Sequence, residues 1–395
     1  MSEIELTTKP IANTGITHHK KLHYRMKTKA WKLQRLQAKR MRRTYARRRH
    51  RRNQKRLQFS IESHARRITR VEFNEGLNRY THTLSSPRDL DLQDNYNATI
   101  AFLNRVRQAI SGIQHGLVID LKDLKVISPA AALLLVAELD RWRETTRTKR
   151  LNTVEAEKWD PNVTMQLHQL GFFDLLGAEI DTSALPDSSQ QAHIKFLRGH
   201  QSLGEAARKL RMSIEDLGLT LSEPGALYDG LVEAMTNVRH HAYPSSRHQG
   251  RWWMSASVDK GTNQLTVMFL DHGQGIPTSL PRSRIWPDVN SAISKIGSLG
   301  GMDHGNLIKA AITAKRTRTG DLHRGNGLRD DIQGYVEKQS VNGALRIYSN
   351  YGYYKFTKEE DNREASITKR LPRHLQGTFL EWRIMERRQD EQKSH

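Results

Sequence analysis

The chain has 395 residues and carries 64 Lys and Arg against 42 Asp and Glu, which gives a formal charge of +22. It has no cysteine, so disulfides, thiolate metal sites and a cysteine nucleophile are excluded. The longest apolar run, residues 130–137, is much shorter than the roughly 20 residues of a membrane helix. The first ten residues lack the pattern of a signal peptide. We therefore expect a soluble cytoplasmic protein with no membrane attachment and two or three structural units.

Residues 1–75 are predicted to form a basic arm. The stretch 16–70 holds 21 Lys or Arg and one acid, Glu62, so the rest of the chain is nearly neutral. Such like charges repel one another, and we expect the arm to order only against an anionic partner. We predict that residues 17–70 bind the phosphates of DNA or RNA. An acidic protein, an acidic membrane surface and a localisation signal remain alternatives. The arginines expected to contact phosphates are Arg47, Arg48, Arg49, Arg51 and Arg52.

Residues 76–185 have the alternating pattern of a small α/β domain. The apolar run 116–121 predicts a buried strand, and 129–142 predicts a helix that begins at Pro129 with Ser128 as its N-cap. A further helix is expected to end at Gly171. Residues 181–192 have the composition of a linker.

Residues 193–386 predict an α+β domain, followed by a charged tail at 387–395. Helices are expected near 206–218, 231–243 and 327–339. Strands are expected at 193–199, 250–259, 264–271, 344–356 and 377–384, with hairpin turns at 260–263 and at 350–352. Helices combined with hairpins indicate a layer of helices on a largely antiparallel sheet.

The helix at 231–243 carries polar groups at every fourth position, namely Glu233, Asn237 and His241. This spacing places them on one face, while Leu231, Ala234, Met235 and Val238 face a core. The polar face is either solvated or lines a site. For His240 and His241, a phosphate contact and simple packing at the helix end both remain open.

Two glycine-containing segments follow this helix. Asp271 ends a predicted strand, and Gly273 and Gly275 lack the Cβ atoms that would keep a ligand away from the backbone. An ionised carboxylate only accepts hydrogen bonds, so Asp271 suits the amino group of adenine and not the carbonyl of guanine. Farther on, Gly325 and Gly327 precede a helix, whose N-terminal N–H groups suit phosphates. We expect His272 to be exposed. Trp252 and Trp253 should alternate between the two faces of their strand, so that one of them lies in the core.

The order of these motifs resembles the GHKL ATPase superfamily, whose nucleotide-binding unit is the Bergerat fold. The resemblance covers about residues 205–386 and implies ATP and Mg²⁺ as ligands. It implies that Asn237 coordinates Mg²⁺, that Glu233 orients or deprotonates water and that Asp271 reads adenine. The remaining positions that it assigns to nucleotide binding are Gly273, Gly275, Ile276, Gly325, Gly327, Leu328 and Thr378.

The segment between Ile276 and Gly325 is long enough to form a lid over a bound nucleotide. Its basic residues either meet the γ-phosphate or belong to a solvated loop. They are Lys315, Arg316, Arg318 and Arg324. A lysine supplied from a neighbouring domain, as in the gyrase branch, cannot be placed in this sequence, so the resemblance supports ATP binding more strongly than ATP hydrolysis.

The 76–185 block resembles STAS domains, as in anti-sigma-factor antagonists. Those proteins carry a phosphorylatable serine just after an acid, whereas this chain has Ser128 in the acid's place and alanine at the phosphoacceptor position. The resemblance therefore implies a module for docking a protein partner or for dimerisation, without that phosphorylation switch.

Four functions follow from these patterns. We favour an ATP-gated switch ATPase that controls partner or nucleic-acid binding. The main alternative is a serine protein kinase of the anti-sigma type. A histidine kinase is disfavoured because none of the 18 histidines precedes Asp or Glu. A structural nucleic-acid binder with a degenerate nucleotide site is disfavoured by the intact pair Glu233 and Asn237.

Overall fold

The computed structural model separates Met1–Ser63 from a compact unit, His64–His395. The five arginines predicted to bind nucleic acid and the tail at 387–395 lie outside the described residues, as do Gly325 and the four basic lid residues. The described ranges are 69–74, 79–112, 117–145, 155–186, 190–200, 204–244, 250–283, 285–296, 303–314 and 327–386.

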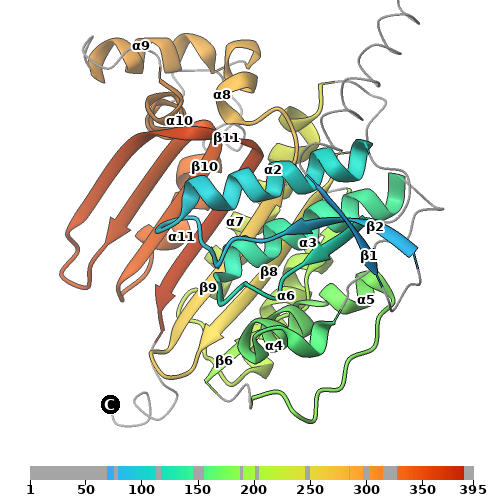
Figure 1. The fold of residues 1–395 in the computed structure, drawn as a ribbon. Coiled ribbons are helices and arrows are strands. Elements are labelled where there is room, and N and C mark those ends of the chain that lie inside the picture. The colour runs from blue at the N-terminus through green and yellow to red at the C-terminus, as the bar shows by residue number, and fades with distance from the viewer. Residues whose placement is uncertain are drawn as a thin grey trace, which may run out of the picture. The chain divides into compact units, whose positions relative to one another are not determined.

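The compact unit alternates short strands and helices first and then builds one large sheet (Figure 1). The first elements are β1 (Arg70–Asn74), β2 (Arg79–Ser85), β3 (Asp89–Leu90), α2 (Tyr96–Gly112), β4 (Leu117–Asp120), β5 (Val126–Ile127), α3 (Pro129–Thr145), η1 (Ala156–Lys158), α4 (Pro161–Leu170) and α5 (Phe172–Leu176). The later elements are β6 (Gln191–His193), β7 (Leu197–Gly199), α6 (Gly204–Asp216), α7 (Pro224–Asn237), the π-helical turn η2 (Val238–Ala242), β8 (Trp252–Asp259), β9 (Gln264–Asp271), α8 (Ile276–Ser279), η3 (Leu280–Arg282), α9 (Trp286–Ile296), α10 (His304–Thr313), the π-helical turn η4 (Leu328–Gln333), α11 (Gly334–Glu337), β10 (Gly343–Lys358) and β11 (Glu364–Met385).

In the first segment, β2 pairs antiparallel with β1 and parallel with β4, and the chain crosses between the parallel strands through α2. The predicted strand and helix are confirmed as β4 and α3. Ser128 caps α3, because its Oγ accepts a hydrogen bond from the backbone N–H of Ala131 at 3.3 Å. Helix α4 ends at Gly171, which is left-handed with φ +90°. Strand β1 lies inside the stretch expected to be arm.

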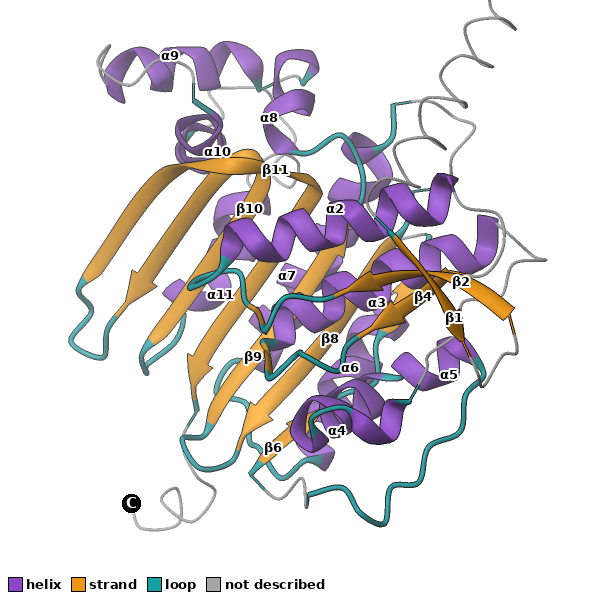
Figure 2. Cartoon of the chain, viewed as in Figure 1, coloured by secondary structure: helices purple, strands orange, loops and turns teal. Residues whose placement is uncertain are grey.

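The large sheet is antiparallel and has the order β10-β11-β9-β8-β6, with β7 also pairing with β8. The hairpin predicted at 260–263 joins β8 to β9, where Asp259 Oδ1 accepts hydrogen bonds from the N–H groups of Gly261 and Thr262. Figure 2 shows helices on both faces of this sheet. The predicted site residues lie on this sheet and on the helices that pack against it.

The two faces of the sheet pack against different helices. Leu265, Val267 and Phe269 of β9 join one core with α6, α7, α10 and α11. Leu270 joins the other core, which includes α2, α3 and α4. Both faces of the central strands are therefore buried.

The expected alternation of the two tryptophans is confirmed, but both of them lie in a core, where one was expected. Trp252 and Trp253 point to opposite faces, and both side chains are buried, since the core containing α2 and α3 covers the face that we expected to be solvated.

The second hairpin was misplaced by the sequence prediction. Residues 350–352 do not form a turn but an irregularity within β10, where the pairing register with β11 shifts. Asn350 has φ +53°, and the chain continues as a strand to Lys358. The turn lies at 359–363, where the N–H of Glu359 donates to the carbonyl of Arg363. A bulge and a turn use similar residues, which explains the misassignment.

The architecture is mixed α/β, with helices packed on both faces of an antiparallel sheet, in keeping with the predicted α+β class. None of the helices in the described part of the chain has the length and apolarity that a membrane crossing requires.

Candidate functional site

The C-terminal end of α7 presents Glu233 and Asn237 side by side. The helix begins at Pro224 and buries its apolar stripe, including Leu231 and Met235, under the sheet. Its other face carries the two polar residues one turn apart, and Asn237 Nδ2 donates a hydrogen bond to Glu233 Oε1 at 3.1 Å. The predicted polar stripe is thus a paired carboxylate and carboxamide. The amide oxygen of Asn237, the atom type that binds Mg²⁺, lies outside this bond.

Glu233 lies in an environment that disfavours its charge. Burial and the nearby charge of Asp331 together raise its pKa from 4.5 to about 7, and the hydrogen bond from Asn237 opposes this rise. Gly327 packs directly on this carboxylate, because a Cβ at position 327 would overlap the Glu233 carboxyl group. The glycine expected at the phosphate end therefore lies against the residue expected to activate water.

Asp271 is the last residue of β9 and is buried, with 5% of its surface exposed. Its Oδ1 accepts a hydrogen bond from the N–H of Gly273 at 2.6 Å. Burial raises the pKa of Asp271 to about 7, although hydrogen bonds from Gly273 and Thr378 act against that rise. Thr378 lies directly opposite Asp271 in the register of β11 and β9. Two of the residues that were expected to bind nucleotide are thus neighbours.

The loop after Asp271 is held by the rest of the protein. A Cβ at Gly273 would overlap Ala242, and one at Gly275, which has φ +80°, would lie 2.5 Å from Asn350 Oδ1. We had attributed these glycines to close approach of a ligand. The structure corrects this for both, because neighbouring protein atoms fill the space that a Cβ would need. Ile276 follows, and its N–H donates to Ser349 Oγ at 2.9 Å.

One continuous helical segment joins these two groups of residues. Helix α7 passes into η2, and the N–H of Gln274 donates to the carbonyl of Ala242 at 2.8 Å. The Gln274 side chain also donates to the carbonyl of His241 at 2.7 Å. At about 1.5 Å per residue, Glu233 and the Asp271 loop are roughly 13 Å apart along the helix. The predicted phosphate-end residues therefore lie on this segment, and the predicted base-end loop contacts the segment at its other end.

The histidines at the end of this segment do not continue the predicted face. The chain leaves α-helical geometry at Val238, so the four-residue spacing from Asn237 to His241 no longer corresponds to one turn. His240 and His241 are exposed, with ring centroids 6.1 Å apart. Their contact with a phosphate remains a prediction.

The region between Ile276 and Gly327 contains its own small core. Leu280, Val289 and Leu307 pack together from η3, α9 and α10. Ile276 and Leu328 are partly buried against both this core and the larger core beneath α7. These two predicted site residues therefore join the lid segment to the sheet.

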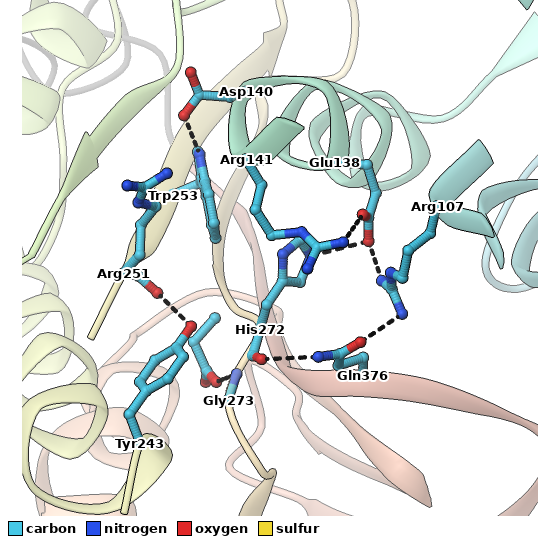
Figure 3. Close-up of polar contacts among 11 residues, drawn as sticks. Arg107, Glu138, Asp140, Arg141, Tyr243, Arg251, Trp253, His272, Gly273 and Gln376 are labelled. Carbon is cyan, nitrogen blue, oxygen red and sulfur yellow. Dashed lines mark hydrogen bonds and ion pairs between the residues drawn. The ribbon is translucent and has the colours of Figure 1, made fainter. Parts of the chain in front are cut away.

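Sequence reasoning missed a second group of residues at the Asp271 loop. His272 is buried, with 5% of its surface exposed, so its expected exposure is wrong. Glu138 of α3 lies beside it, and Arg107 of α2 and Gln376 of β11 complete the group (Figure 3). The sequence feature that could have revealed this group is Glu138, an acid within the apolar run 129–142.

The donor set fits Mg²⁺ bound together with a ligand that brings its own oxygens. Within the described residues, no group of three or more His, Asp or Glu side chains is arranged to hold a metal alone. The amide oxygen of Asn237 would be one ligand of such an ion, and the carboxyl groups of Glu233 and Asp331, when ionised, would favour a cation nearby. No family model matches the chain, and no curated protein matches it either.

Proposed function

We propose that residues 193–386 bind Mg-ATP and that the chain is a switch ATPase of the GHKL type. The observation that supports this most directly is the segment α7–η2, which carries Glu233 and Asn237 and contacts the Asp271 loop. A nucleoside triphosphate has a base and a phosphate chain at opposite ends, and the two groups of residues are separated in the same way.

At the base end, Asp271 is the proposed reader of adenine. Its carboxylate is fixed by the Gly273 N–H and lies beside Thr378. When ionised, it accepts a hydrogen bond from the exocyclic amino group of adenine. Guanine presents a carbonyl at the corresponding position, and two acceptors repel each other. The chain should therefore prefer ATP over GTP.

At the phosphate end, Asn237 would hold Mg²⁺ through its amide oxygen, and Mg²⁺ would offset the phosphate charge. Glu233 is the proposed general base. A base is most effective when its pKa is close to the working pH, and the pKa of Glu233 is about 7. Gly327 allows the following helical segment to lie against Glu233 without a side chain between them.

The resemblance of residues 76–185 to a STAS domain supports a docking role and not a phosphorylation switch. Ser128 Oγ is used as the cap of α3, and Ala130 and Ala131 are buried. We propose that a protein partner or a second copy of the chain docks on this segment, and that the nucleotide state controls the association.

The serine-kinase alternative is separated from the ATPase by following the γ-phosphate. The full chain is incubated with Mg²⁺ and γ-labelled ATP, alone and with candidate partner proteins. Release of free phosphate supports the ATPase, and label retained on protein supports the kinase. Glu233→Gln should abolish phosphate release while ATP still binds, since the glutamine keeps the shape but is not a base.

Binding itself is tested by calorimetric titration with Mg-ATP. Asn237→Ala should weaken affinity at least about tenfold, because it removes a metal ligand; His200→Ala, at an exposed position outside the site residues, is the control. If the wild-type chain shows no heat with Mg-ATP under conditions where it is folded, the proposed function is wrong.

We propose that the arm, residues 17–70, binds nucleic acid through phosphate contacts. A stretch with 21 basic residues and one acid should bind with steep salt dependence and little sequence preference. Removing residues 17–70 should abolish retention of RNA or DNA on a filter at low salt. Retention that is unchanged by the deletion would rule out the arm as the binding site.

A further inference from the structure

Helix α3 carries two fully buried acids in an otherwise apolar stretch. Glu138 is 2% exposed and Asp140 is 0% exposed. A buried carboxylate is costly unless charged partners and hydrogen bonds compensate for its lost hydration. The partners of Glu138 and Asp140 therefore indicate what these residues hold in place.

Glu138 belongs to a closed ring of contacts (Figure 3). It forms an ion pair with Arg107 of α2, and it lies 3.4 Å from Nε2 of His272. Arg107 Nη1 donates to Gln376 Oε1 at 2.7 Å, and Gln376 Nε2 donates to the carbonyl of His272 at 3.2 Å. The ring thus joins α2 and α3 to both the side chain and the backbone of His272. A second arginine, Arg141, bonds Glu138 from within α3 at 3.2 Å.

The residue that these contacts hold in place is His272. Burial lowers its pKa to about 4, so the imidazole is neutral near pH 7. The charge of Glu138 is therefore balanced by the two arginines. The His272 ring packs against Trp253, with centroids 4.9 Å apart, and Trp253 Nε1 donates to Asp140 Oδ2 at 2.8 Å. Glu138 therefore contacts His272 directly, and Asp140 is linked to His272 through Trp253.

The position of His272 in the loop links these contacts to the Asp271 carboxylate. It lies between Asp271 and Gly273, which are themselves hydrogen-bonded to each other. The loop is short, and its backbone is fixed from one side by Ala242 and from the other by Gln376. A shift of His272 therefore shifts the Asp271 carboxylate.

We propose that Arg107 and Glu138 are positioning residues for Asp271, so that the α/β segment containing α2 and α3 sets nucleotide affinity through His272. The effect on nucleotide affinity rests on the proposed function, in which Asp271 binds adenine. The positioning of Asp271 by Arg107 and Glu138 does not depend on that function. A partner that moves α2 or α3 would alter nucleotide binding, and nucleotide would alter partner binding by the same factor.

The test uses Glu138→Gln in the full chain, which keeps the side-chain shape and removes the charge. Hydrogen–deuterium exchange of peptides covering residues 271–276 should become at least about threefold faster, and Mg-ATP affinity should fall about tenfold. Arg107→Gln is the second variant, at a side chain that is 21% exposed, and it should give the same two changes to a lesser degree.

Glu381→Gln is the matched control. Glu381 is a buried acid with two arginine partners, Arg346 and Arg383, but these belong to β10 and β11. Its substitution should lower thermal stability and leave both the exchange of 271–276 and the affinity for Mg-ATP unchanged. In a double-mutant cycle, Glu138→Gln should have little further effect on affinity in a His272→Ala background.

The outcomes separate the inference from the proposed function. If folded Glu138→Gln and Arg107→Gln leave the exchange of 271–276 unchanged, or if Glu381→Gln accelerates it equally, the positioning role is wrong. If exchange responds as expected but the wild-type chain binds no nucleotide, the positioning role stands and the proposed function fails. If exchange responds and nucleotide binds equally well to all variants, the link to affinity is overturned.

Discussion

Asn237 donates a hydrogen bond to Glu233 from one helical turn away, and the same carboxylate lies within the field of Asp331 on η4. The pKa of Glu233 is therefore set by opposing influences. Burial and Asp331 raise it to about 7, while Asn237 lowers it. If Glu233 is the general base, ATP turnover depends on this balance.

We predict that phosphate release rises with pH between 6 and 8, with a midpoint near 7, because only ionised Glu233 accepts a proton. Asp331→Asn removes a negative charge that disfavours ionisation, so the midpoint should move to lower pH. The measurement is the pH profile of turnover for wild type and variant. Asp361→Asn, in the turn between β10 and β11, should leave the midpoint in place. If Asp331→Asn leaves the midpoint unchanged, the charge of Asp331 does not raise the pKa of Glu233.

The contact between Gly327 and Glu233 predicts a loss of activity without a large loss of stability. The atoms nearest to a methyl group at position 327 are Cδ, Oε1 and Cγ of Glu233, a flexible side chain that can rotate away. Gly327→Ala should therefore change the melting temperature by no more than a few degrees and reduce turnover at least about tenfold. Thermal unfolding and phosphate release together test this. Full activity in a folded variant would show that Glu233 does not need its observed position.

The burial of Asp271 predicts a conflict between stability and function. Its folded-state pKa is raised from 3.8 to about 7, so its contribution to stability is fully present below pH 4 and is lost as the pH rises through 7. Asp271→Asn removes this pH dependence. The variant should gain about 2–3 kcal/mol relative to wild type between pH 5 and pH 8.

Chemical denaturation of both proteins at pH 5 and pH 8 gives this difference. The same variant should bind ATP more weakly, because an amide nitrogen presented to adenine repels its amino group. An equal stability difference at the two pH values would mean that Asp271 titrates normally in the folded protein.

Local patterns predicted the elements that depend on neighbours in sequence. Ser128 and Pro129 begin α3, Gly171 ends α4, and residues 260–263 turn the β8–β9 hairpin, because capping and turn bonds reach only a few residues along the chain. The resemblance assigned both Asp271 and Thr378 to nucleotide binding, and the two lie opposite each other in the pairing of β9 and β11.

The features that were missed depend on distant parts of the chain. Asn350 resembles a turn residue, but its side chain donates to the carbonyl of Gln274, and β10 continues past it. His272 is buried by Glu138, which precedes it by more than a hundred residues. No local pattern reveals that α2 and α3 cover the second face of the sheet.

Gly377 offers the most direct test of the packing behind Thr378. It has φ +83°, and a Cβ there would overlap the carbonyl oxygen of Asp271, which is backbone that cannot move aside cheaply. Gly218 has nearly the same φ, +85°, with nothing within 4 Å of the corresponding position. Both alanine variants carry the strain of a left-handed residue, about 1–2 kcal/mol. Gly377→Ala should cost at least about 2 kcal/mol more than Gly218→Ala, because only it must displace the end of β9. Urea unfolding of the two variants measures the difference, and equal costs would mean that β11 does not pack on Asp271 as closely as described.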